Sequence, residues 1–584
     1  MERLKRHENS ERSIADAGVE EQSNSRTGHD RSADWRVKSQ LRGGRDRWGE
    51  VRAERKDICC VRLGERADLE GVFSQSMDMK NVSADAAELP ASGGRKAVGS
   101  RWWGWIVLAL LIGYGSFLAV YFVPVASGSD SSGYLNFADL LLRGRLIDEA
   151  RPIVGWRSDS PFATAPLGFL MEEETGRFVP TYPSGVPLHF AAAELVLGRV
   201  LGMYLVGLGG ALAAVVFCYL VGREIGLSRT LAAVSAAMLA WNPVFLFVAI
   251  QPLSDVLATT WCLAAVWGVL RSRRATGWAW FAGAAAAMAV LVRPTNLLLF
   301  PALLVWMPSW RALGWFVLGG LPGAAWMAWY QNALYGSPLT SGYGDVRSIF
   351  GWDNLGPTAA HYVKWFPRFV PIVWILAVVA LVRSLRAEGR SALALSLWFG
   401  AIAVFYVFYD VTQEAWWCLR FLLPAMPALI LGGALGIETM RRRGGGRAVH
   451  VWRWSVVAIA IWAAGLGWNW SGKVNALGPS RAEAPYQEIA TWIDEHAPRN
   501  AAVATLYASG AVHYYTKCAV LRWDMIERRE FEEFSRKVNL EVQPVYALLF
   551  HEEAARAFER LPGGWEKLFE NSRGAVWRFL GPAS

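Results

Sequence analysis

Residues 102–134, WWGWIVLALLIGYGSFLAVYFVPVASGSDSSGY, decide the fold class. The apolar part of this stretch, residues 105–123, is close to the roughly 20 residues that cross a bilayer as a helix. Arg95, Lys96 and Arg101 precede it, and basic residues beside a span stay in the cytoplasm. We therefore expect an uncleaved signal anchor that carries the chain to the outer face, where the polar segment SGSDSSGY begins.

The composition of the 584-residue chain points the same way. Hydrophobic residues make up 53% and charged residues 19%, with 31 Trp, which excludes an ordinary soluble enzyme. Further apolar runs lie at about 186–221, 230–250, 254–270, 276–292, 295–310, 312–330, 367–382, 391–409, 420–438 and 452–470. We therefore predict an α-helical polytopic membrane protein with about 11 to 13 transmembrane helices; the family resemblance given below implies that its membrane is a bacterial inner (plasma) membrane.

The net charge of +9 arises from clusters that lie between apolar runs, at 271–274, 383–390 and 441–443. This is the positive-inside pattern rather than a nucleic-acid surface, so no nucleic-acid partner is expected. It places the loops 331–366 and 410–419 outside the cell. The total number of crossings must then be odd, yet residues 186–270 resemble four spans where three or five would fit.

Three regions differ in character. Residues 1–100 are polar without apolar periodicity, which predicts a disordered cytoplasmic tail or, alternatively, a mis-assigned start codon ahead of Met77 or Met79. Residues 101–470 hold the spans and a long polar outer loop, 124–187. Residues 471–584 predict a small extracytoplasmic α/β domain. Its expected helices are 485–497, 527–537 and 552–560, and its expected strands are 502–507, 513–516, 520–523 and 545–550.

The outer loop begins with the first candidate site. Asp130 and Tyr134 place a carboxylate and a phenol four residues apart at the outer membrane surface, before an amphipathic helix over residues 134–143 that would lie flat at the interface. The alternative is that Asp130 only caps this helix. The loop ends in the motif Tyr182-Pro-Ser-Gly-Val-Pro-Leu-His189, whose prolines are also simple helix-start signals and whose histidine is also a typical satisfied interfacial residue.

Two arginines lie in apolar surroundings. Arg293, followed by Pro294, interrupts the apolar residues 278–306, and an arginine at membrane depth marks a functional cavity unless it snorkels from a turn. Arg420 follows two tryptophans at the outer end of a late span, where it suits a lipid phosphate. Tyr343 lies in the second large outer loop.

The order of these motifs resembles the GT-C membrane glycosyltransferases. The motifs are Asp130-x-x-x-Tyr134, Tyr182-Pro-x-Gly-x-Pro, Leu253-Ser254-Asp255, Arg293-Pro294-Thr295, Gly336-Ser337-Pro338 with Gly342-Tyr343, and Arg420-Phe-Leu-Leu-Pro424. Within that superfamily the chain is most similar to the bacterial branch related to protein O-mannosyltransferases and to aminoarabinose or galacturonic acid transferases of lipid A. The resemblance covers residues 102–470.

The resemblance implies an inverting transfer of a hexose or pentose from a polyprenyl-phosphate donor to an extracytoplasmic acceptor: lipid A, another glycolipid or a protein. Asp130 would be the catalytic base. Membrane lipids would be further partners of the protein. Tyr134, Tyr182, His189, Arg293, Tyr343 and Arg420 would bind substrate or the lipid phosphate. Relatives often carry a second adjacent acid, which is missing here, and Asp159, residues 172–174 and Asp345 are the substitutes that the sequence offers.

No metal site or resident cofactor is expected. The six Cys show no Cys-x-x-Cys spacing, and the chain has no Asp-x-Asp pair and no His/Asp/Glu cluster with ligand spacing, although a divalent metal stays an open alternative. A secondary transporter and a membrane scaffold with an outer binding domain are the rival functions. The absence of two similar halves and the long outer loop favour the enzyme over the transporter.

Overall fold

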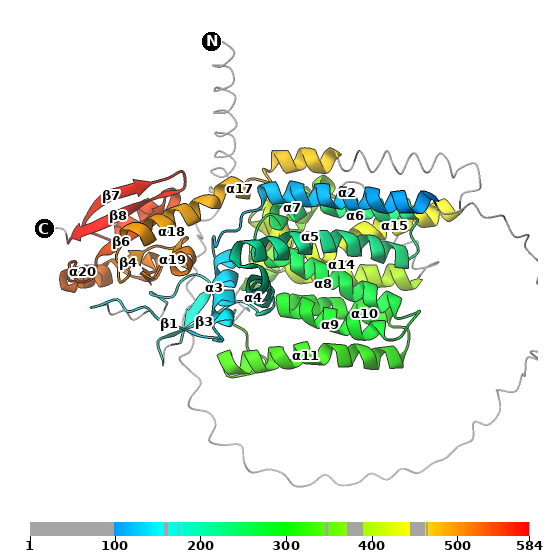
Figure 1. The fold of residues 1–584 in the computed structure, drawn as a ribbon, viewed down its shortest axis with the longest axis horizontal. Coiled ribbons are helices and arrows are strands. Elements are labelled where there is room, and N and C mark those ends of the chain that lie inside the picture. The colour runs from blue at the N-terminus through cyan, green and yellow to red at the C-terminus, as the bar shows by residue number, and fades with distance from the viewer. Residues whose placement is uncertain are drawn as a thin grey trace, which may run out of the picture. The chain divides into compact units, whose positions relative to one another are not determined.

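The computed structural model describes residues 98–156, 160, 162–172, 175–344, 349–370, 389–443, 462 and 465–582 (Figure 1). Nearly all of the predicted tail, most of the spans predicted at 367–382 and 452–470, and the acidic residues Asp159, Glu173, Glu174 and Asp345 lie outside these ranges.

The membrane part is built from apolar helices that run side by side (Figure 1). They are α2 (Val98–Tyr121), α5 (Arg199–Glu224), α6 (Arg229–Ala240), α7 (Pro243–Ala249), α8 (Ser254–Arg271), α9 (Trp278–Val292), α10 (Phe300–Trp306), α11 (Trp310–Tyr335), α14 (Gly389–Val407) and α15 (Met426–Arg443). In the described part of the chain, five helices are long and apolar enough to cross a membrane, and the bent pair α6 and α7 makes a sixth candidate. The larger predicted total stays a prediction.

The ambiguous region 186–270 divides into one short helix and three longer pieces. The short helix, α4 (Gly185–Leu197), has 13 residues and a rise of about 20 Å, less than the ~30 Å hydrocarbon core. After α5, the helices α6 and α7 meet at an angle of 60° where Asn242 caps α7 ahead of Pro243. Of these pieces, α5 and the bent pair α6 and α7 are candidate spans, and the number of crossings in this region stays open.

The outer loop holds α3 (Asp130–Leu142) and a three-stranded antiparallel sheet of order β1-β3-β2. The strands are β1 (Asp148–Glu149), β2 (Phe169–Met171) and β3 (Arg177–Pro180). Helix α3 starts four residues earlier than predicted and is buried over most of its length. It does not lie flat with one face in water, because α4 and α19 (Ser509–Tyr515) both pack against it.

Residues 479–581 contain a five-stranded mixed sheet with helices on both faces. The strand order is β5-β4-β6-β8-β7. The strands are β4 (Ala502–Ala504), β5 (Ala519–Leu521), β6 (Val545–Phe550), β7 (Gly564–Glu570) and β8 (Gly574–Gly581); β4 pairs in parallel with β5 and β6, and the other pairs are antiparallel. Helices α18 (Ala484–His496) and α19 cover one face, and α20 (Arg528–Lys537) and α21 (His551–Arg560) cover the other.

Two sequence predictions fail in this region. Residues 513–516 were expected as a strand, but 513–515 end helix α19, because Ala511 and Val512 pack onto the sheet at helical spacing. The hairpin of β7 and β8 was missed. The remaining short elements are α12 (Leu355–Phe369), α17 (Pro479–Ala482), η2 (Pro294–Leu299), η4 (Trp352–Asn354), η5 (Asp410–Gln413), η6 (Trp416–Ala425) and η7 (Trp523–Met525).

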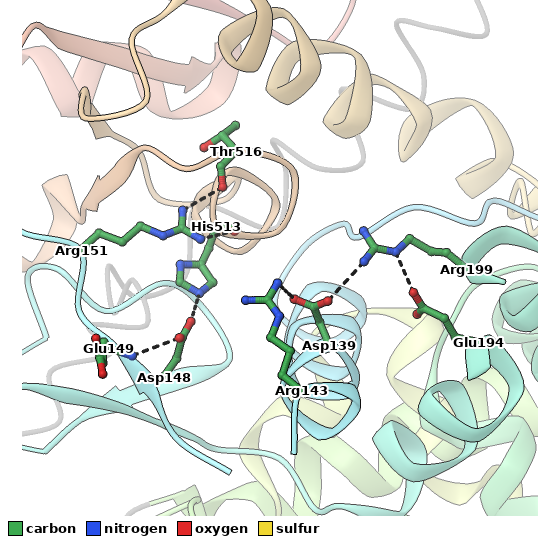
Figure 2. A network of polar contacts seen from close by, with 9 residues as sticks. All are labelled: Asp139, Arg143, Asp148, Glu149, Arg151, Glu194, Arg199, His513 and Thr516. Atoms are coloured by element: carbon green, nitrogen blue, oxygen red, sulfur yellow. Dashed lines mark hydrogen bonds and ion pairs between the residues drawn. The ribbon is translucent and has the colours of Figure 1, made fainter. Parts of the chain in front are cut away.

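Polar contacts join the outer loop to α19 (Figure 2). The guanidinium of Arg151 donates to the backbone carbonyls of His513, Thr516 and Cys518 at 2.7–3.0 Å. The His513 ring is buried, and its Nε2 lies 3.0 Å from Asp148 Oδ2. Burial lowers the pKa of His513 to about 4, so the ring is neutral near pH 7 and donates a hydrogen bond to the carboxylate.

A second cluster in Figure 2 lies beside α3. Asp139 is ion-paired with Arg143 and with Arg199, and Arg199 also bonds Glu194 at 3.1 Å. The Arg199 guanidinium lies 4.8 Å from the ring centre of Tyr514 in α19. The second cluster therefore ties α3, the helix that carries Asp130, to the start of α5, and the first ties the following loop to α19.

Candidate active site

Four charged side chains from four separate elements form one chain of ion pairs. Asp130 lies 2.7 Å from Arg420, Arg420 lies 3.8 Å from Asp255, and Asp255 lies 2.8 Å from Arg293. All four are largely buried, with side-chain exposures of 26%, 19%, 0% and 12% in that order of Asp130, Arg420, Asp255 and Arg293. Burying four charged groups beside a membrane costs free energy, so this cluster marks a candidate functional site.

Asp130 is the first residue of α3. Ser129 occupies the cap position and makes no side-chain cap bond, so the alternative in which Asp130 only caps the helix is wrong. Its Oδ2 accepts from Arg420 Nη2 at 2.7 Å and its Oδ1 accepts from the Tyr182 hydroxyl at 2.8 Å. Although burial favours the neutral acid, the Arg420 charge and these bonds hold the pKa of Asp130 below its usual range, so the group is a carboxylate.

Tyr182 lies across the start of α3 because Gly133 has no side chain. A Cβ at Gly133 would lie 2.5 Å from Tyr182 Cε2, far inside contact distance. The Tyr182 hydroxyl also bonds Ser129 Oγ at 2.6 Å, and its ring packs 4.9 Å from Tyr134 and 6.3 Å, edge-on, from Tyr343. The three predicted tyrosines therefore surround the catalytic candidate.

Asp255 is the residue that sequence reasoning overlooked as a site residue. It is the second residue of α8 and is fully buried. Both of its carboxylate oxygens lack a hydrogen bond to any described residue, although each lies within ion-pair distance of an arginine. The sequence signal for Asp255 was a carboxylate in an apolar span. It also belongs to the motif Leu253-Ser254-Asp255, which was part of the family resemblance. Asp255 is linked to Asp130 through Arg420, whereas Glu172 pairs with Arg177 away from this cluster.

Arg293 is positioned by a break in the membrane helices. Pro294 disfavours a helical conformation at the preceding residue, so α9 ends at Val292 and Arg293 is extended. Its side chain reaches across to the start of α8, where Nη2 meets Asp255 and lies 3.2 Å from Ser254 Oγ. Its Nη1 is a buried donor with no partner among the described residues.

Arg420 lies in the 3₁₀ helix η6 at the entrance to α15. The aromatic ring of Phe421 lies 5.4 Å from its guanidinium and 5.6 Å from that of Arg293, within cation–π distance of both. Stacking of this kind keeps both guanidinium groups oriented while their edges stay free for hydrogen bonds.

His189 does not join this group through any contact in the described chain. Its Nδ1 lies 2.6 Å from the Gly185 carbonyl, and its Nε2 accepts from Trp261 Nε1 at 3.0 Å. With both ring nitrogens bonded inside the protein, a substrate role for His189 stays a prediction, and the geometry favours the satisfied interfacial histidine.

No metal centre is evident in the described ranges, where three or more His, Cys, Asp or Glu side chains nowhere come together as ligands. The four described cysteines, Cys218, Cys262, Cys418 and Cys518, are buried and free. The predicted absence of a metal and of a resident cofactor stays a prediction.

Comparison with solved structures identifies the architecture. The chain superimposes on ArnT from Cupriavidus metallidurans bound to undecaprenyl phosphate with a TM-score of 0.52 at 13% identity, over 81% of this chain and 98% of that one. The chain has the GT-C glycosyltransferase fold. The apo form of ArnT gives the same TM-score at 14% identity. The oligosaccharyltransferase AglB from Archaeoglobus fulgidus, in complex with an inhibitory peptide and a dolichol-phosphate, gives 0.50 at 11% identity over 82% of this chain and 74% of that one.

A comparison of the sequence with protein-family models and with curated proteins finds no match. The recognition of the GT-C fold from ordered motifs is therefore confirmed by structure alone.

Proposed function

We propose that this GT-C protein is an integral membrane glycosyltransferase that moves a sugar from a polyprenyl-phosphate donor to an extracytoplasmic acceptor. The observation that carries the proposal is the pairing of Asp130 with Arg420 in a buried cluster that also holds Arg293. Transfer from a phosphate needs a carboxylate that removes the acceptor proton and cations that stabilise the departing phosphate. This cluster contains both.

Arg293 and Arg420 are the proposed phosphate ligands. Arg293 Nη1 is a buried donor without a partner, and a buried donor of this kind needs an acceptor. Guanidinium groups bind phosphate oxygens through paired hydrogen bonds. Structural neighbours that were determined with undecaprenyl phosphate and with a dolichol-phosphate support a lipid-linked donor. Tyr134, Tyr182 and Tyr343 would orient the sugar ring beside the same carboxylate.

The mechanism follows from competition for Arg420. Without a ligand, Arg420 holds one oxygen of Asp130 and keeps its pKa low, which makes Asp130 a weak base. A bound phosphate attracts Arg420, so one Asp130 oxygen is released and its affinity for a proton rises. Donor binding would thus activate the base. Asp255 would keep Arg293 and Arg420 in place throughout.

The reaction then balances as an inverting displacement. The acceptor oxygen forms a bond to the sugar's anomeric carbon while its proton goes to Asp130. The bond from that carbon to the phosphate oxygen breaks, and the polyprenyl phosphate leaves with the electron pair, next to the two arginines. Lipid A, another glycolipid or a protein hydroxyl each provide a suitable acceptor oxygen.

The proposed location is a bacterial inner membrane with the site on its extracytoplasmic side. The basic clusters at 271–274 and 441–443 would be cytoplasmic, and η6, which carries Arg420, would lie at the outer end of its span. A secondary transporter would also use a buried arginine, but it would not consume a sugar donor. A scaffold would need neither Asp130 nor Arg420.

The test is sugar transfer into cell-envelope material by membranes that contain wild type, Asp130→Asn or Arg420→Lys at matched expression. The donors are labelled polyprenyl-phosphate hexoses and pentoses. Wild type should transfer label, and both variants should lose at least a hundredfold in rate, since a positioned base contributes roughly 10²–10⁴-fold. Equal label transfer by wild type and Asp130→Asn would reject the proposed base.

A further inference from the structure

Two tryptophans and three basic residues gather at one end of the membrane helices. Trp365 lies in α12, and Trp470 lies in the helical segment that leads into the C-terminal domain; their rings meet edge to face with centres 6.3 Å apart. Lys364 Nζ lies 5.0 Å from the centre of the Trp365 ring, and Lys473 Nζ lies 4.9 Å from the centre of the other ring. The Arg368 guanidinium lies 5.6 Å from the first ring and 5.3 Å from the second, so it joins the two halves. We call these five residues the basic tryptophan patch.

The three cations of the basic tryptophan patch have no anionic partner. Within the described part of the chain, none of them forms an ion pair with an aspartate or a glutamate, and Arg368 donates only to the backbone carbonyl of Lys364. His361 also faces Lys364, but burial and that cation lower its pKa to about 4, so the ring is neutral near pH 7. A cation that lies against an aromatic ring keeps its full charge. The patch therefore presents three positive charges that nothing in the described chain neutralises.

The patch lies at the surface of the helices, at the same end as the candidate active site. The apolar side chain of Val363 on α12 is 74% exposed, as in a helix that rests at a membrane surface. On the other side of α12, the Trp365 ring stacks on buried Phe369, with centres 5.1 Å apart, and Phe369 meets Trp416 at 5.8 Å. Trp416 is the first residue of η6, the element that carries Arg420.

The charge pattern of the sequence makes these cations exceptional. It predicts that the loop 331–366, which contains Lys364, and the region 471–584, which contains Lys473, are outside the cell. Basic residues beside membrane spans are concentrated in the cytoplasm, so a group of them at the outer end needs another reason. Lipid headgroup phosphates supply one, because they are anionic, lie at the depth of interfacial tryptophans and accept paired hydrogen bonds from arginine.

We infer that the basic tryptophan patch binds the headgroup phosphate of an anionic membrane lipid, with Arg368 as the central ligand and Lys364 and Lys473 beside it. A lipid suits this surface better than free phosphate does. The lipid is already concentrated at the membrane, and its acyl chains can pack on exposed apolar side chains such as Val363. The inference does not depend on the proposed transfer reaction.

The experiment measures lipid binding to the full-length protein, purified in a neutral detergent. The probes are radiolabelled dioctanoyl phosphatidylglycerol, which is anionic, and dioctanoyl phosphatidylcholine, which has the same acyl chains and no net charge. Wild type should bind phosphatidylglycerol at least tenfold more tightly, because each basic residue near a membrane surface contributes roughly fivefold in affinity. Equal affinities for the two lipids would overturn the inference. Millimolar inorganic phosphate should leave most of the lipid bound, and its complete displacement would show a site for the free ion and overturn the assignment to a lipid.

A triple variant tests the three cations together. Lys364→Gln, Arg368→Gln and Lys473→Gln combined should lower the affinity for phosphatidylglycerol at least tenfold and leave that for phosphatidylcholine unchanged. An unchanged affinity for phosphatidylglycerol would overturn the inference. Lys364→Arg combined with Lys473→Arg keeps the charge, so this variant should bind phosphatidylglycerol within about threefold of wild type. A loss as large as that of the triple variant would assign the effect to packing rather than charge and would also overturn the inference.

The matched control removes the same charge from the predicted cytoplasmic end of the helices. Its three arginines are exposed and have no ion pair in the described chain; the substitutions are Arg229→Gln, Arg273→Gln and Arg311→Gln. The control should change the affinity for phosphatidylglycerol less than twofold. An equal loss in the control and in the triple variant of the patch would show unspecific attraction of the lipid to a basic protein, and the inference would fail.

Discussion

Replacement of Asp255 by Asn should destabilise the protein by about 3–5 kcal/mol, the usual cost of removing one partner from a buried ion pair. The carboxylate is fully buried, with Arg293 Nη2 at 2.8 Å and Arg420 Nη1 at 3.8 Å. At an effective dielectric constant of ~20, these separations correspond to attractions of about 6 and 4 kcal/mol before desolvation. The variant would keep two buried cations and lose the anion that neutralises them.

The assay is a double-mutant cycle of unfolding in mixed detergent micelles, with wild type, Asp255→Asn, Arg293→Gln and the double variant. Because the second substitution removes an unpaired cation, the double variant should be more stable than Asp255→Asn alone, with a coupling of about 2 kcal/mol or more. Asp353→Asn, at an exposed aspartate, is the control and should stay within about 0.5 kcal/mol of wild type. Additive effects of the two site substitutions would refute the reasoning.

Three further predictions follow from the packing around α3. Tyr182→Phe removes a hydrogen bond that lowers the pKa of the Asp130 carboxylate, so the acid limb of the pH–rate profile should move to higher pH; an unchanged limb would contradict the proposed base. Gly510→Ala should cost at least tenfold in transfer activity, because a Cβ there would lie 2.0 Å from a serine hydroxyl of α3, and activity at the wild-type level would show that this contact is dispensable. The pKa of His513 is about 6.5 in the unfolded chain and about 4 in the folded protein. The contribution of the neutral His513 ring to the free energy of unfolding is therefore full above pH 6.5 and declines below it. At pH 5 the protein loses about 2 kcal/mol of this stability. Thermal unfolding of wild type and His513→Gln at pH 7 and pH 5 measures this loss, and only their difference is diagnostic, because Glu553, with its pKa raised to about 7, responds in the opposite sense in both proteins.

The sequence was informative where physical chemistry leaves few alternatives. An arginine in an apolar stretch is costly, so Arg293 and Arg420 stood out, and Asp130 stood out as a carboxylate directly after the first span. The structure brings these three together with Tyr134, Tyr182 and Tyr343. The ordered motifs were enough to recognise the GT-C fold.

The remaining features depend on long-range packing that no local pattern encodes. Helix α3 looks amphipathic, yet α19, about 370 residues away in sequence, covers its other side through contacts such as Asn136 Nδ2 to the Gly510 carbonyl. Asp255 sits in a family motif, but only the folded chain brings it to two arginines.

The measurement that most directly tests the central claim is the rate of sugar transfer from labelled polyprenyl-phosphate hexoses and pentoses by purified wild type and Asp130→Asn in detergent. Donor binding is measured in parallel. The account predicts that Asp130→Asn still binds the donor while transfer falls by a factor of at least 10². Transfer by the variant at the wild-type rate would contradict the account, because the carboxylate at the centre of the cluster would then have no role in the reaction.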